Sequence, residues 1–215
     1  MRSIGAIILA AGGSFRLGQP KQLLTFRGET LVQRAVRAAT EGGCQPVIVV
    51  AGQLAETIRI ALDNPESFRP RSSNLPAEPG AARATIVENA QWQSGIGTSI
   101  RRGLEQLPKS VQGVVLLTCD QPFVDAQIVA RLIAEREKTG KPIVASHYAN
   151  THGVPVLFDR SFFDALLRLP DNSGAKSLIE AHPGEIASIE FEAGTVDIDT
   201  PNDLDHLERP ASLSD

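Results

Sequence analysis

Short apolar runs alternate along this chain with longer segments in which apolar residues recur every three or four positions. The runs that predict strands are residues 4–9, 46–51, 84–87, 113–118 and 142–146. The spacing between them predicts helices over residues 31–41, 54–62, 95–104 and 128–138. Strands that alternate with helices indicate an α/β fold with a mainly parallel sheet.

The pattern becomes less regular in the last third of the chain. It predicts strands over residues 153–158, 187–191 and 196–198, a helix that includes residues 162–167, and another over 174–181. Thr200 is predicted to cap a short final helix that begins at Pro201. Residues 63–82 lack periodicity and are interpreted as a solvated surface insertion rather than a lid.

Composition narrows the classes of protein that fit. A chain of 215 residues, 42% of them hydrophobic, can bury one full core, so we expect one domain over residues 1–208 and a frayed tail over 209–215. The net charge of −4 argues against a nucleic-acid or membrane surface. Cys44 and Cys119 lack zinc-ligand spacing, and the sequence offers no signal peptide or membrane span. We therefore expect a cytoplasmic protein with reduced thiols.

A glycine-rich loop follows the first predicted strand. Gly12 and Gly13 would let backbone N–H groups approach phosphate oxygens, and Arg16 and Lys21 add positive charge. The loop is not a Walker A motif, because Gln and Pro stand at positions 19 and 20 where Lys and Ser or Thr should follow, and its glycines do not match the dinucleotide fingerprint. We interpret it as a triphosphate-binding loop; the alternative is an ordinary tight turn.

Acidic residues follow two other predicted strands. Asp120 comes directly after residues 113–118, where an open parallel sheet binds its ligands, and could hold Mg²⁺ together with phosphate oxygens. The alternative role of Asp120 is a turn cap. Asp197 and Asp199 would lie on one face of the strand predicted at 196–198, and Asp199 is the preferred second metal ligand, with helix capping as its alternative.

The segment 89–99 combines glycines and small hydroxyls before a helix, which suits close approach of a nucleobase to the backbone. Ser99 could read the base or simply cap the helix. For Trp92, core packing is favoured over a stacking role. Cys119 is interpreted as a buried thiol rather than a nucleophile, since no general base is evident beside it.

Together these motifs resemble the molybdenum cofactor cytidylyltransferases, which are MobA-like NTP transferases. The resemblance spans nearly the whole chain and depends on Leu-Ala-Ala-Gly-Gly-Ser-Phe-Arg-Leu-Gly-Gln-Pro-Lys at 9–21, Asn-Ala-Gln-Trp at 89–92 with Gly95 and Ser99, Thr-Cys-Asp-Gln-Pro at 118–122, Gly-Val-Pro at 153–155 and Asp-Ile-Asp-Thr-Pro at 197–201. Leu-Ala-Ala-Gly and Cys-Asp-Gln-Pro resemble the cytidylyl branch more than the guanylyl branch. Two positions depart from the family pattern: Leu17 replaces a Met, and Asn172 stands where the family has an Asp that contacts the cofactor half.

The resemblance implies a Rossmann-like three-layer sandwich with a mainly parallel mixed sheet, of the nucleotide-diphospho-sugar transferase type. It also implies that catalysis depends on Lys21, Arg16 and Asp120, and that Mg²⁺, or alternatively Mn²⁺, binds to Asp120 and Asp199. The implied nucleotide-binding residues are Leu9, Ala10, Ala11, Gly12, Gly13, Ser14, Arg16, Lys21, Gly52, Asn89, Gly95, Ser99 and Asp120.

The reaction implied by the resemblance transfers CMP from CTP to the terminal phosphate of the molybdopterin cofactor and releases pyrophosphate. The substrates are then CTP and a molybdopterin-type cofactor, and a transient contact with a molybdoenzyme or its maturation factor would follow. Two alternatives stay open: a cytidylyl- or guanylyltransferase acting on a sugar or polyol phosphate, and a non-catalytic module that binds a nucleotide or a pterin cofactor.

Overall fold

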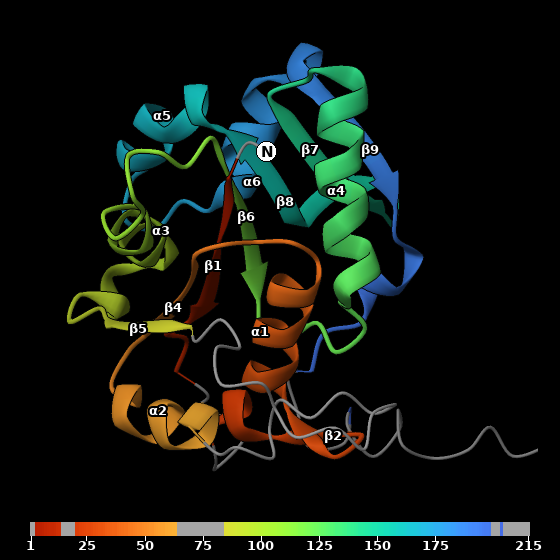
Figure 1. Ribbon diagram of the computed structural model, residues 1–215. Coiled ribbons are helices and arrows are strands. Elements are labelled where there is room, and N and C mark those ends of the chain that lie inside the picture. The colour runs from red at the N-terminus through yellow and green to blue at the C-terminus, as the bar shows by residue number, and fades with distance from the viewer. Residues whose placement is uncertain (1–2, 14–19, 64–83, 199–202, 204–215) are drawn as a thin grey trace, which may run out of the picture.

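A seven-stranded mixed sheet forms the centre of the computed structural model, which describes residues 3–13, 20–63, 84–198 and 203 (Figure 1). The strand order is β5-β4-β1-β6-β8-β7-β9. Only β8 runs antiparallel to its neighbours in this sheet. The strands are β1 (Ile4–Ala10), β4 (Val47–Ala51), β5 (Thr85–Glu88), β6 (Gly113–Thr118), β7 (Ile143–Tyr148), β8 (Thr151–Asp159) and β9 (Ile186–Glu190).

Helices cover both faces of the sheet (Figure 1). One face packs against α1 (Leu31–Glu41), α2 (Ala55–Asp63) and α4 (Ala126–Thr139), and the other against α3 (Ile96–Leu104), α5 (Phe163–Leu167) and α6 (Ala175–Ala181). Successive residues of a strand point to opposite faces, so that Ile8 of β1 joins the first layer and Ile7 the second. Burial on both sides explains why the central strands are continuous apolar runs, and the predicted three-layer α/β fold is confirmed.

Local signals explain where the helices begin and end. Thr30 and Gln33 form a capping box at the start of α1, in which each side chain accepts a hydrogen bond from the other residue's backbone N–H. Asp125 caps α4 by accepting from the N–H of Ile128, and Gly140 ends it in the left-handed conformation. The helices expected after the first, second and fourth predicted strands are confirmed.

A small hairpin between β1 and α1 was not predicted. It consists of β2 (Thr25–Phe26) and β3 (Glu29–Thr30), joined by Arg27 and Gly28, both with positive φ. Two residues with positive φ are the signature of a tight hairpin turn. Strands of two residues are too short for a pattern of alternation to reveal them.

The strand predicted at residues 196–198 is wrong. This segment follows the 3₁₀ turn Glu192–Thr195 and pairs with no strand among the described residues. It lies instead beside the loop after β6, where the N–H of Ile198 donates to the carbonyl of Asp120. Its alternation arises because Ile198 is buried in a small cluster with Leu24 and Phe26, while Asp197 is exposed.

Several predictions fall outside the described residues. These are the 63–82 insertion, of which only residue 63, the last residue of α2, is described, and the final helix predicted to begin at Pro201. In the ranges 3–13, 20–63 and 84–198, no helix is both long and apolar enough to cross a membrane.

Candidate active site

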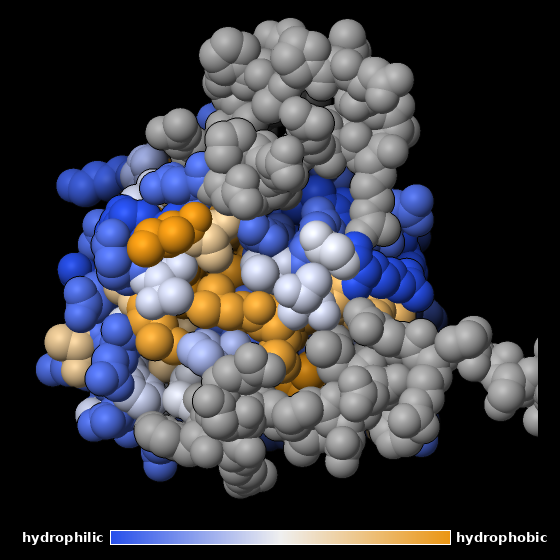
Figure 2. Space-filling view, turned by 90° about the horizontal axis from the view of Figure 1, so that it is seen from below, coloured by the Kyte–Doolittle hydropathy of each residue, from blue (hydrophilic) through white to orange (hydrophobic). Residues whose placement is uncertain are grey.

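The candidate site lies at the carboxyl ends of β1 and β6, which are adjacent parallel strands paired from Ile4 with Gly113 to Leu9 with Thr118. This pairing brings the two predicted loops together across about a hundred residues of sequence. Between them is a cavity of about 210 Å³ on the face shown in Figure 2, where apolar surface lies in the middle with hydrophilic residues on its left and upper right. Its lining residues are Leu9, Ala11, Gly12, Lys21, Gln22, Trp92, Ile96, Ser99, Thr118, Cys119 and Asp120.

An ion pair between Lys21 and Asp120 forms the polar wall of this cavity. Lys21 begins the 3₁₀ turn Lys21–Leu23, and its Nζ lies 2.7 Å from Oδ2 of Asp120. Both side chains are mostly shielded, with 18% and 23% of their surface exposed, so the pair is oriented rather than freely solvated. The sequence predicted that both residues face a triphosphate; it did not predict that they contact each other.

Hydrogen bonds from Gln22, a residue that the sequence did not single out, fix the backbone of the loop that follows β1. Its amide nitrogen donates to the carbonyls of Ala10 and Gly12, each at 2.8 Å, and only 1% of the residue is exposed. Gly12 is exposed, and the space that a Cβ there would occupy is open. A buried glutamine next to a lysine carries no distinctive sequence signal. Gly13 is exposed, while Ser14 and Arg16 lie outside the described residues.

The segment 89–99 is organised by hydrogen bonds among its own side chains. The buried amide of Asn89 donates to the hydroxyls of Thr98 and Ser99 at 2.8 and 3.0 Å, and its Oδ1 accepts from the N–H of Gln91. Ser99 lies within α3 and lines the cavity, so the capping alternative for Ser99 is wrong. Asn89 does not line the cavity; it positions Ser99.

Trp92 forms another wall of the cavity, and the preferred prediction that it packs in the core is wrong. Its side chain is half-buried and lies against Gly52, where a Cβ would come within 2.9 Å of both the indole ring and the carbonyl of Ala11. Gly95 serves a different contact. It has φ of 136°, and a Cβ there would clash with the carbonyl of Asp171. Neither glycine lines the cavity: Gly52 allows Trp92, which does, to lie close to the backbone, and Gly95 allows close packing against the backbone at Asp171.

The acidic residues suit a hard divalent cation. Burial raises the pKa of Tyr148, a hydrogen bond with Gln121 opposes that rise, and the negative charges of Asp197 and Asp120 add to it. Asp120 lines the cavity, and Asp197 precedes Ile198, whose N–H donates to the carbonyl of Asp120. One or two carboxylates with phosphate oxygens are what Mg²⁺ or Mn²⁺ requires, so this donor set fits such an ion. Within the described ranges, no group of three or more His, Cys, Asp or Glu side chains is placed to hold a metal ion. Phosphate oxygens of a bound nucleotide would therefore have to supply part of the coordination. Asp199 lies outside the described residues.

Cys119 is adjacent to Asp120 but is not a reactive thiol. Burial, reinforced by the charge of Asp120, raises the pKa of Cys119 to about 12, and its Sγ contacts the carbonyl of Leu9. A thiol so buried carries almost no thiolate at neutral pH. The prediction of a buried thiol is confirmed.

Two known proteins are similar to this chain along almost its whole length. The nicotine blue oxidoreductase of Paenarthrobacter nicotinovorans is 27% identical over 96% of this chain and 94% of its own length. The crystal structure of Rv0371c from Mycobacterium tuberculosis has a TM-score of 0.73 and 26% identity, over 96% of this chain and 98% of that one, and another structure of that protein is a complex with manganese.

A shorter match shows that the shared unit also occurs inside larger proteins. The bifunctional protein GlmU of Syntrophotalea carbinolica is 34% identical over 63% of this chain, but the match covers only 26% of GlmU. The sequence model of one protein family, the MobA-like NTP transferase domain, matches residues 6–186 of this chain. The chain therefore belongs to the MobA-like NTP transferase family, and is a nucleotidyltransferase by that membership.

Proposed function

We propose that this protein is a cytoplasmic enzyme that transfers CMP from CTP to the terminal phosphate of a molybdopterin-type cofactor and releases pyrophosphate. The observation that carries the proposal is the Lys21–Asp120 pair, whose two residues line one cavity from the segments that follow the adjacent parallel strands β1 and β6. Family membership supports nucleotidyl transfer. The Leu-Ala-Ala-Gly and Cys-Asp-Gln-Pro motifs resemble the cytidylyl branch and support CTP as the donor, and the molybdopterin acceptor is proposed from the resemblance along the whole chain.

The side chains of this cavity can each take one part in the reaction. Lys21 would stabilise negative charge that develops on the departing pyrophosphate. Asp120, with Asp199 as second ligand, would hold Mg²⁺ or Mn²⁺, which when bound screens the phosphates and orients them. Ser99 and the backbone near Ala11 would contact the base. The acceptor phosphate is already ionised at neutral pH, so no general base is needed.

Divalent metal use has support beyond the donor set. The mycobacterial relative has been crystallised with manganese, and the partly exposed carboxylate of Asp120, which lines the cavity, is chemically suited to the same kind of ion. Because Lys21 already contacts Oδ2 of Asp120, a bound cation and the ammonium would compete for the same carboxylate. We therefore expect Lys21 to contact phosphate oxygens when metal and nucleotide are both present.

Asp120→Asn and Lys21→Met test the proposal directly, since both keep the approximate size of the side chain. If each contact stabilises the transition state by about 3 kcal/mol, each variant should release pyrophosphate about 10²-fold more slowly. Lys141→Met is the matched control. Lys141 is exposed and precedes β7, which runs in the same direction as β6, so it lies at the amino ends of these strands, away from the cavity at their carboxyl ends. Wild-type rates in the Asp120 or Lys21 variant would contradict the proposal.

A second experiment with the wild-type protein tests which nucleotide is the donor and which phosphate is the acceptor. Pyrophosphate release is measured with CTP, GTP, ATP and UTP in the presence of molybdopterin cofactor, a sugar phosphate or a polyol phosphate, and the product is identified by its mass. A CMP adduct of the cofactor is the expected result. Preference for GTP or for another phosphate would correct the substrates, and nucleotide binding with no pyrophosphate release would favour a binding module.

A further inference from the structure

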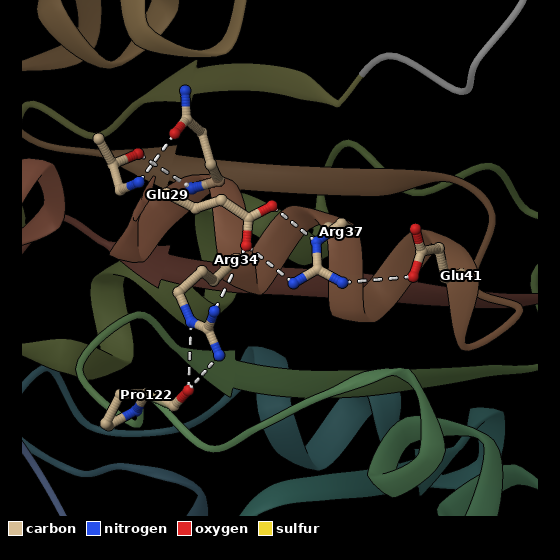
Figure 3. Close-up of polar contacts among 7 residues, drawn as sticks. Glu29, Arg34, Arg37, Glu41 and Pro122 are labelled. Carbon is tan, nitrogen blue, oxygen red and sulfur yellow. Dashed lines mark hydrogen bonds and ion pairs between the residues drawn. The ribbon is translucent and has the colours of Figure 1, made fainter. Parts of the chain in front are cut away.

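Arg34 reaches from α1 to the loop that carries Asp120. Its Nε and Nη2 donate to the carbonyl of Pro122 at 3.2 and 2.7 Å (Figure 3). The two residues are 88 positions apart in the sequence. Two N–H groups that converge on one carbonyl restrain both the position and the orientation of that peptide. Arg34 therefore restrains the loop at a point two residues beyond Asp120.

The guanidinium of Arg34 is itself fixed by its neighbours. Its Nη1 lies 3.3 Å from Oε2 of Glu29 on β3, and its plane lies over the ring of Phe26 on β2, 5.0 Å from the centroid. Glu29 also binds Arg37 at 2.8 Å, which fixes the carboxylate that Arg34 contacts (Figure 3). With 11% of its side chain exposed, Arg34 is held in a partly desolvated setting in which such contacts are strong.

The same structural unit carries Lys21. The turn Lys21–Leu23 leads directly into the β2–β3 hairpin, and the N–H of Leu31 at the start of α1 donates to the carbonyl of Leu24. The ring of Phe26 on this hairpin meets that of Phe123 edge-to-face, 5.8 Å between centroids. The hairpin and α1 thus hold Lys21 on one side and the Asp120 loop on the other.

We propose that Arg34 is a positioning residue that keeps the carboxylate of Asp120 opposite Lys21 and available to a divalent cation. This inference rests on the proposed function, in which Asp120 is the metal ligand. The segment 194–198 makes two other hydrogen bonds with the loop. The N–H of Ile198 donates to the carbonyl of Asp120, and the side-chain amide of Gln121 donates to the carbonyl of Gly194. Ile198 and Phe123 also pack against Phe26 of the hairpin, and to this apolar packing Arg34 adds two directional hydrogen bonds between α1 and the loop.

Arg34→Ala, Arg34→Lys and Arg37→Ala test this role. Arg37 shares the ion pair with Glu29 but has no hydrogen bond to Pro122, so Arg37→Ala is the matched control for the loss of a charge from this network. The first measurement is hydrogen exchange of the peptide 118–126 without nucleotide or metal. We expect faster exchange in Arg34→Ala, and exchange close to wild type in Arg37→Ala.

The second measurement is function at a temperature well below unfolding. Because misplacement by about 1 Å can cost up to 10²-fold, we expect Arg34→Ala to lower kcat and weaken Mn²⁺ binding by about tenfold each, with KM for CTP changed less than about twofold. Mn²⁺ alone is the probe, followed by the electron paramagnetic resonance signal of the free ion. Arg34→Lys should be intermediate, since it keeps the charge but loses the planar pair of donors.

The outcomes separate the inference from the proposed function. Mn²⁺ binding that is unchanged in Asp120→Asn would contradict the metal role of Asp120, whatever Arg34 does. Mn²⁺ binding that is weakened in Asp120→Asn but unchanged in Arg34→Ala would overturn the role of Arg34 alone. Equal effects of Arg34→Ala and Arg37→Ala on kcat would also overturn it, because charge loss would then explain both.

Discussion

At the scale of single residues, the contact between Gly52 and Trp92 determines the shape of one wall of the cavity. A methyl group at position 52 would lie 2.9 Å from Cγ of the indole and 2.9 Å from the carbonyl of Ala11. The ring must then move or the first loop must shift. Either change alters the space into which a nucleotide would fit.

Gly52→Ala is accordingly expected to weaken CTP binding by about tenfold, in line with the 1–3 kcal/mol that overpacking usually costs. Trp92 is the only tryptophan in the chain, so its fluorescence reports both the displacement and the titration with CTP. Gly184→Ala is the control, because a Cβ at Gly184 would meet no atom within 4 Å. Unchanged CTP affinity in Gly52→Ala would show that Trp92 does not bound the nucleotide site.

At the scale of elements, Arg136 on α4 is joined to Asp159 at the end of β8. Arg136 is buried, and it donates from Nε and Nη2 to Oδ2 of Asp159. Burial is the largest single effect and raises the pKa of Asp159. The hydrogen bonds from Arg136 and Ser161 and the positive charge of Arg136 together outweigh it, so the pKa is lowered from its ordinary 3.8. The pair fastens the longest described helix to the sheet.

The lowered pKa sets the direction of a pH dependence. A carboxyl with a lower pKa in the folded state stabilises that state above its unfolded pKa and loses this contribution as the pH falls through the folded value. The free energy of unfolding of Asp159→Asn should therefore lie below wild type at pH 6, and the two should converge below about pH 3.8. Denaturant unfolding from pH 2 to pH 7 measures this difference.

The control for this series is Asp164→Asn. Asp164 pairs with Arg168 at 3.6 Å, but about four fifths of both side chains is exposed, at 82% and 79%. Exposed pairs contribute little, so the free energy of unfolding should change by less than about 0.5 kcal/mol. A pH-independent difference between Asp159→Asn and wild type would mean that the charge of Asp159 is not what stabilises the contact.

Elements differ in how far the sequence reveals them. The strands β1 and β6 are predictable because they are buried on both faces and read as uninterrupted apolar runs, and the prediction for β6 matches its bounds. The segment 196–198 misleads, because one buried side chain, Ile198, produces the alternation of a strand although no strand in the described part of the chain pairs with it. Local periodicity reports burial, and only neighbouring chain segments decide whether a strand forms.

The same limit applies to the site. Asp120 and the loop at Gly12 could be predicted because ligands of parallel sheets gather where strands end. The contact of Arg34 with Pro122 spans 88 residues, and an arginine on the polar side of an amphipathic helix looks like any solvated residue in the sequence. Residues that position others depend on the assembled fold, so pattern alone does not identify them.

At the scale of the whole molecule, both cysteines belong to the core cluster between the sheet and α1, α2 and α4. Burial raises the pKa of Cys44 and of Cys119 to about 12, so a thiol reagent at pH 8 meets almost no thiolate in the folded protein. The cluster extends across several strands and helices, and opening it requires that they separate together. The reactivity of both thiols should therefore follow unfolding of this layer.

We expect a disulfide reagent at pH 8 to modify Cys44 and Cys119 at the same slow rate, measured by mass spectrometry of peptides. Saturating CTP with a divalent cation should slow both equally, by the factor 1 + [L]/Kd, because a ligand that binds only the folded state lowers the unfolded population. Cys119 also lines the cavity, whereas Cys44 does not, so opening of the cavity alone would expose Cys119 and leave Cys44 buried. Rapid modification of Cys119 with Cys44 intact would show that the cavity opens locally, and CTP would then protect Cys119 alone.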